Sequence, residues 1–151
     1  MDIWVLNKNL DRVGIIDGYQ SIIWSTRYAE VGDFELYLAA SDNVLDLVKE
    51  GFYLVRDQDI DGSRYNNVMI AENFEITTDI ESGDHLIITG KDLKSIIRRR
   101  VVINQTIMNG QVQACVQRLL NENVIAPSDT KRKINNFTFV NNAAISGTMS
   151  M

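Results

Sequence analysis

The sequence is poor in cysteine, proline and histidine. It has one of each, at Cys115, Pro127 and His85. A single cysteine excludes an intramolecular disulfide framework and a cysteine-rich zinc site. One proline excludes a proline-rich linker, and one histidine excludes catalysis by a pair of histidines.

Long apolar runs are also missing. The 151 residues contain no apolar stretch of about 18 residues, the length of a membrane span. The amino-terminal segment lacks the basic and apolar parts of a secretory signal. With 45% hydrophobic and 23% charged residues, the chain has the composition of a globular protein. We expect a soluble protein, made inside the cell, with a core of its own.

Charge is distributed unevenly along the chain. Residues 1–90 carry 6 basic and 17 acidic side chains, whereas residues 91–151 carry 9 basic and 3 acidic ones. The net charge of −5 therefore combines an acidic first part with a basic second part. This polarity is typical of a nucleic-acid-binding face or of complementary subunit surfaces, and two solvated surfaces that merely differ produce it too.

Short β-branched and aromatic segments dominate the first ninety residues. Apolar and polar residues alternate from Phe34 to Leu38, which is typical of a half-buried antiparallel strand. Asp17-Gly18 is a hairpin signal between two such segments. The predicted strands cover residues 3–6, 13–16, 21–28, 34–38, 52–56, 68–78 and 85–89.

Two short helices are predicted, over residues 42–49 and residues 93–98. Ser41 and Asp92 are their expected N-caps. The inner face of the first helix would consist of Val44, Leu45, Leu47 and Val48.

The strongest helix signal covers residues 111–123. Its apolar residues follow the i, i+3, i+4, i+7, i+8 pattern, so we expect the helix to cover an open face or end of a sheet. Strand fragments are predicted at 101–103 and 134–140, and no clear element after residue 141. The pattern favours a mainly β protein with some helix, either an antiparallel barrel or an α+β domain.

The acidic segment from Asp57 to Gly62 has the beginning of a calcium-binding loop. The bidentate glutamate expected at the twelfth position is replaced by Val68, and the flanking segments are predicted strands rather than helices. An acidic hairpin loop is therefore the favoured interpretation, and we expect no metal. Gly83 and Gly90-Lys91 have the wrong spacing for a phosphate-binding loop.

His85 and Cys115 are the candidates for nucleophilic chemistry. His85 lies at the start of a predicted strand, and Cys115 lies in the apolar stripe of the predicted helix. Both are expected to be structural. Since no convergent pair of carboxylates is visible either, we predict no catalytic site, no cofactor and no enzyme activity.

Two basic clusters, Arg98-Arg99-Arg100 and Lys131-Arg132-Lys133, are candidates for phosphate binding. Neither contains the interleaved aromatic residues that stack on single strands. We therefore favour a solvated helix end or a subunit contact, and expect no sequence-specific nucleic acid.

Two segments resemble a known family. The more specific is the string Trp24, Arg27, Tyr28, Gly32, Asp33, Phe34, Glu35 and Leu36; the second is Gly90-Lys91-Asp92-Leu93 followed by the arginine run. Together with the order of the predicted elements, which covers nearly the whole chain, they resemble the N-terminal part of siphovirus tail-associated or baseplate hub proteins. These are tail-tip proteins of phages and prophages of Gram-positive bacteria.

The resemblance implies a β-barrel tube-like hub domain over residues 1–140 with a flanking amphipathic helix. Residues 141–151 would be a polar tail or the start of a following domain. It implies a non-catalytic virion protein whose three copies form a ring. The ring would link the distal tail protein or tail tube protein to tip or fibre proteins. DNA would pass through its lumen without sequence-specific recognition. Family members usually have more than twice this length, so we expect an N-terminal portion or a short version.

The contact residues of such a ring stay unknown from the sequence. We hypothesise that the acidic first part and the basic second part supply complementary faces, because ring closure requires two different faces of each subunit to meet. The alternative function is a small β-barrel binding module of oligonucleotide/oligosaccharide type, which shares the strand-rich plan. A steep salt dependence of retention on heparin or DNA would distinguish that alternative.

Overall fold

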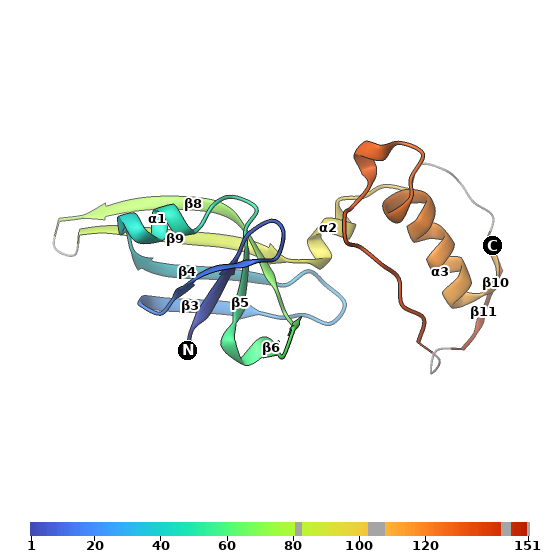
Figure 1. Cartoon of the computed structure of the whole chain (residues 1–151), viewed down its shortest axis with the longest axis horizontal. Coiled ribbons are helices and arrows are strands. Elements are labelled where there is room, and N and C mark those ends of the chain that lie inside the picture. Colours follow the sequence, from blue (N-terminus) through green and yellow to red (C-terminus); the bar gives the residue numbers. More distant parts are fainter. Residues whose placement is uncertain (81–82, 103–107, 143–145, 151) are drawn as a thin grey trace. The chain divides into compact units, whose positions relative to one another are not determined.

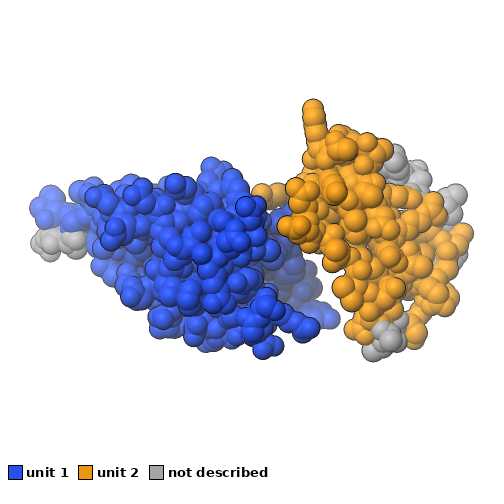
Figure 2. Space-filling model, viewed as in Figure 1, with its two compact units in different colours: residues 1–97 blue, residues 98–151 orange. Residues whose placement is uncertain are grey.

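The chain forms two compact units, residues 1–97 and residues 98–151 (Figures 1 and 2). The computed structural model describes residues 1–80, 83–102, 108–142 and 146–150. The domain predicted over residues 1–140 extends across both units, and the tail predicted from residue 141 lies within the second. The predicted end of the domain at residue 140 and the predicted start of the tail at residue 141 therefore stay predictions.

The first unit is built on a seven-stranded antiparallel sheet (Figure 1). Its strand order is β2-β1-β5-β8-β9-β4-β3. The strands are β1 (Ile3–Leu6), β2 (Arg12–Ile16), β3 (Tyr19–Ser25), β4 (Asp33–Ala39), β5 (Tyr53–Arg56), β8 (Met69–Asp79) and β9 (Gly83–Asp92). A short ribbon of β6 (Ile60–Asp61) and β7 (Arg64–Tyr65) follows the 3-10 turn η1 (Asp57–Asp59). The seven predicted strands of the first ninety residues are thus confirmed, with small shifts at their ends.

The hairpin predicted at Asp17-Gly18 is wrong. These residues connect β2 to β3, but β2 pairs with β1 and β3 pairs with β4, at opposite ends of the strand order. Two linking residues place the Cα atoms of Ile16 and Tyr19 at most about 11 Å apart. The sheet therefore curls until its two edges approach. Within the described residues β2 and β3 do not pair, so the sheet is not closed into a barrel.

The core lies on the inside of this curl. Phe34, Leu36 and Leu38 of β4 are at most 3% exposed. Across the ladder to β9, Leu36 lies opposite Ile88 and Leu38 lies opposite Leu86. The residues between them on β4 are exposed or half-buried. Each fully buried side chain of this kind contributes about 1.5–3 kcal/mol. The α+β class is confirmed, since helix α1 completes this core.

Helix α1 (Asp42–Leu47) is shorter than predicted. Val44, Leu47 and Val48 pack against the core, whereas Leu45 is 40% exposed, so its predicted inward position is wrong. The reason is geometric: a helix of six residues presents one narrow face, and Leu45 is turned about 100° from Val44. Ser41 is the N-cap, although its side chain makes no capping hydrogen bond.

The β8–β9 hairpin extends beyond the rest of the sheet (Figure 1). β8 pairs with β9 from Met69 to Asp79, whereas its ladder with β5 is confined to Met69 and Ile70. β9 also pairs with β4 as far as His85, so only Thr78, Asp79, Gly83 and Asp84 form a ribbon of two strands.

The second unit contains the predicted long helix. Helix α3 (Val112–Leu120) continues into a π-helical turn (Asn121–Ile125), and Cys115 is buried beneath it. Helix α2 (Lys94–Arg98), also predicted, lies at the junction of the two units. The remaining elements are the 3-10 turn η3 (Thr130–Arg132) and the pair β10 (Asn109–Gln111) and β11 (Thr148–Ser150).

The strand predicted over residues 134–140 is wrong, because this segment has no strand partner. Asn136 adopts a left-handed φ of 60°, which interrupts an extended conformation. The tail expected to lack regular structure instead contributes β11. Of the strand predicted at 101–103, Val101 and Val102 are irregular and residue 103 lies outside the described residues.

Candidate functional site

The most specific segment of the sequence, residues 24–36, forms the end of β3, the β3–β4 loop and the start of β4. Trp24 lies on the core side, with its ring centroid 5.4 Å from that of Phe34. The guanidinium of Arg56, on β5, lies 5.2 Å from the centroid of the same indole ring. β3 and β5 are far apart in the strand order, so this contact bridges the curl of the sheet.

Asp92, at the end of β9, fastens the β3–β4 loop. Its Oδ2 accepts a hydrogen bond from the Gly32 amide at 2.9 Å, and the Asp92 amide donates to the Gly32 carbonyl at 3.1 Å. Its Oδ1 accepts from the Lys94 amide at 3.0 Å. Asp92 is 7% exposed, and these donors compensate the burial of its charge.

The ammonium of Lys94 completes this arrangement, which we call the loop clamp (Gly32, Asp92 and Lys94). Lys94 Nζ lies 3.1 Å from Asp92 Oδ2 and donates to the Glu30 carbonyl at 2.7 Å and to the Arg27 carbonyl. The loop is thus held by backbone and charge-assisted bonds at both of its ends. An exposed ion pair between Arg27 and Asp33, at 3.2 Å, adds little because solvent screens it.

One glycine in each of the two recognised segments is required by close approach. A Cβ atom at Gly32 would lie 2.4 Å from the Ser25 carbonyl oxygen. One at Gly90 would lie 1.8 Å from the Ile70 carbonyl oxygen and 2.7 Å from the Phe34 ring. The residues that carry the family resemblance therefore build and fasten the curled sheet.

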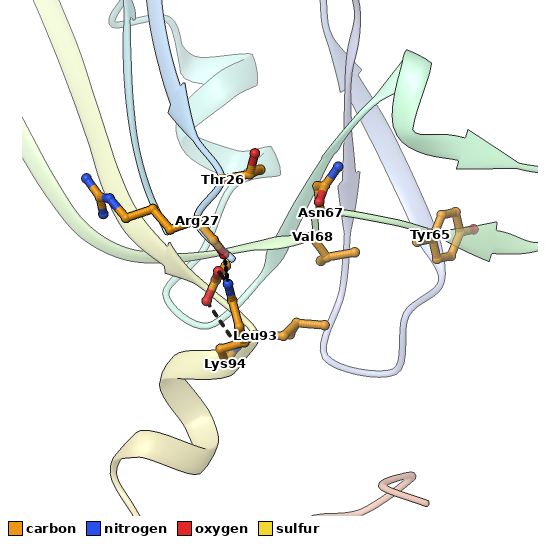
Figure 3. A pocket seen from close by; sticks show the side chains of 8 residues that line it. Thr26, Arg27, Tyr65, Asn67, Val68, Leu93 and Lys94 are labelled. Carbon is orange, nitrogen blue, oxygen red and sulfur yellow. Dashed lines mark hydrogen bonds and ion pairs between the residues drawn. The ribbon is translucent and has the colours of Figure 1, made fainter. Parts of the chain in front are cut away.

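A hollow of about 200 Å³ lies beside the loop clamp (Figure 3). This volume is below the roughly 300–1,000 Å³ of sites that hold small molecules. Asp92 and Lys94 are engaged within the clamp, as the dashed lines at Lys94 show in Figure 3, and the Arg27 guanidinium pairs with Asp33. The lining residues are Thr26, Arg27, Tyr65, Asn67, Val68, Asp92, Leu93 and Lys94. The arrangement is suited to holding the loop rather than to acid–base or nucleophilic chemistry.

The acidic loop that resembles the beginning of a calcium site has protein partners. Asp59, 8% exposed, accepts hydrogen bonds from Arg56 Nε at 2.6 Å and from Asn67 Nδ2 at 2.7 Å. Asp57 accepts one from the Trp4 indole at 3.1 Å. Throughout the part of the chain that the structure describes, no three metal-binding side chains converge. The loop residues are thus used in local structure.

His85 and Cys115 belong to different units and are both buried. His85 is 2% exposed and stacks on Tyr37, with 4.9 Å between ring centroids. Cys115 is 5% exposed within the apolar stripe of α3. These positions fit the structural roles expected for the two residues.

The two basic clusters of the second unit are brought together by the fold. Arg132 Nη2 donates to the Val101 carbonyl at 2.5 Å, which joins the segment after α2 to η3 across 31 residues. The acidic side chains of this unit have local partners. Asp129 caps η3 through the Lys131 amide, and Glu122 pairs with Arg118 at 2.8 Å. The sequence showed the two clusters but not the hydrogen bond that joins their segments.

A comparison with models of protein families matches residues 2–151 to the family described as siphovirus ReqiPepy6 Gp37-like protein. The chain belongs to this family. The match covers almost the whole chain and confirms the resemblance to siphovirus tail-associated proteins. It supports a structural role for this Gp37-like chain in a phage particle. No curated protein and no solved structure matches the chain.

The helices of this Gp37-like chain are short. Within the described ranges, none is both long enough and apolar enough to cross a bilayer.

Proposed function

We propose that this Gp37-like chain is a non-enzymatic component of the tail tip or baseplate hub. Three copies form a ring that links the distal tail protein or tail tube protein to the tip or fibre proteins. The observation that carries the proposal is the family match over residues 2–151. In this assignment the protein acts by docking other copies and other tail proteins.

The curled sheet supports this role. We propose that it is the tube-like barrel domain of the hub, because a two-residue connection brings its edges close together. Val13 and Ile15 on β2 and Ile23 on β3 are 40–55% exposed. Edge strands with apolar side chains pair readily with other chains, and a ring requires such surfaces on each subunit.

The loop clamp supports a structural rather than catalytic role for the recognised residues. Both oxygens of its buried carboxylate, that of Asp92, accept hydrogen bonds from Gly32 or Lys94. A general base needs a free lone pair near a substrate, whereas the carboxylate oxygens of Asp92 hold the β3–β4 loop in place. We therefore propose that the protein performs no reaction.

Antibody labelling of intact particles tests the proposal. Antibodies against the chain, detected with gold in negative-stain micrographs, are expected to mark the distal end of the tail. Labelling of the head, labelling along the tube, or absence of the protein from purified particles would contradict the proposal. Retention of the chain on DNA with a steep salt dependence would favour the binding-module alternative.

A further inference from the structure

The β8–β9 hairpin carries charge of one sign. Residues 72–90 contain five acidic side chains and no lysine or arginine. Glu75 and Asp79 are exposed on β8, and Asp84 is exposed on β9. We call residues 72–80, together with Gly83 and Asp84, the acidic hairpin.

Apolar side chains accompany these acids. Phe74 is 37% exposed, Ile76 is 56% exposed, and Ile80 is fully exposed. Phe74 and Ile76 lie opposite Ile88 and Leu86, so they are on the core side of the ladder, but beyond the end of β5. The first unit covers these two side chains only in part, and adjoining exposed apolar side chains are typical of a contact surface.

The second unit offers a complementary surface. Residues 98–151 contain seven basic and two acidic side chains, and the acids are engaged with Lys131 and Arg118. The hydrogen bond from Arg132 to Val101 joins residues 98–102 to residues 131–133, and we call these two segments the basic surface. It also exposes apolar side chains, with Val101 at 72% and Val102 at 49%.

We propose that the acidic hairpin of one copy docks on the basic surface of a second copy. This inference rests on the proposed function, and it specifies which two surfaces meet between neighbouring copies in the ring. The two surfaces have opposite charges, and both expose apolar side chains. This favours their pairing over a contact between the acidic hairpins of two copies, in which like charges would repel. The basic surface contains no aromatic residue for base stacking, so an acidic protein surface suits it better than a single strand. Because the two surfaces differ, each copy can bind two neighbours, as a ring requires.

Charge reversal on each surface tests the contact with the full chain. The hairpin variant is Glu75→Lys with Asp79→Lys, and the surface variant is Lys131→Glu with Lys133→Glu; all four residues are exposed. A control variant, Asp17→Lys with Asp61→Lys, makes the same charge change at exposed positions of the first unit outside the hairpin. Sedimentation velocity over a range of concentrations measures self-association, and far-ultraviolet circular dichroism confirms that each variant is folded.

The parent chain is expected to self-associate, and salt should weaken this association because it screens the charges. Each of the two contact variants should raise the dissociation constant by about tenfold or more, whereas the control variant should not. An equimolar mixture of the two contact variants should form mixed pairs, because each variant offers the charge that the other lacks. A ring of three should not close in this mixture, because the two variants must alternate around it.

Three results would overturn the inference: a parent chain that stays monomeric at every concentration, contact variants that associate like the parent, or a control variant that is weakened as much as they are. None of these results concerns where antibodies label the particle. A failure of this contact is therefore distinguishable from a failure of the proposed function.

Discussion

Gly90→Ala tests the close approach of β9 to its neighbouring strands β8 and β4. The added methyl carbon would lie 1.8 Å from the Ile70 carbonyl oxygen and 2.7 Å from the Phe34 ring, and the first of these is backbone that cannot rotate away. Forcing atoms into a packed core costs typically 1–3 kcal/mol. Since a strand must move here, we expect a loss of about 3 kcal/mol in the free energy of unfolding, at the upper end of that range.

Urea unfolding followed by tryptophan fluorescence measures this loss. Both tryptophans, Trp4 and Trp24, lie in the first unit, so the signal reports that unit. With a slope of about 1.5 kcal/mol per molar urea, the midpoint should fall by about 2 M. Gly18→Ala is the matched control, because a Cβ there meets no atom within 4 Å. The reasoning is refuted if the two substitutions shift the midpoint equally.

Three further predictions follow from the clamp, the acidic loop and the thiol. Asp92→Ala should cost about 2–3 kcal/mol in the same urea assay, because it leaves the Gly32 amide and the Lys94 side chain without their buried acceptor; an unchanged midpoint would contradict this. Millimolar calcium should leave the melting temperature unchanged, since Asp59 is already bonded to protein donors; a calcium-dependent rise would show a site there. Cys115 should react with a thiol reagent far more slowly in the native than in the urea-unfolded chain, because it is buried; equal rates would disprove this burial.

The strands could be predicted because their signal is local. In β4 the alternation of Phe34, Leu36 and Leu38 with polar residues defines both the strand and its buried face. The helix over residues 112–120 was likewise visible from its apolar stripe. These patterns depend only on residues a few positions apart, so they are visible in the sequence before the fold is known.

Pairing and the candidate site were harder to predict because they depend on distant contacts. Asp17-Gly18 does connect two strands, but core burial pairs β2 with β1 and β3 with β4. Asp92 reaches Gly32 across 60 residues, and Arg132 reaches Val101 across 31. Residues 134–140 are rich in β-branched and aromatic residues like a strand, yet without a partner their backbone groups form no ladder. Resemblance to a family singled out Gly32 and Asp92, whereas their physical role and the part played by Lys94 came from the fold.

A cryo-electron microscopy reconstruction of the tail tip tests the hub assignment most directly. Three copies of the curled sheet are expected in a ring around the channel at the distal end of the tail tube. A tip whose density is fully explained by other proteins, or a single copy of this chain on the outside of the tail, would contradict the account.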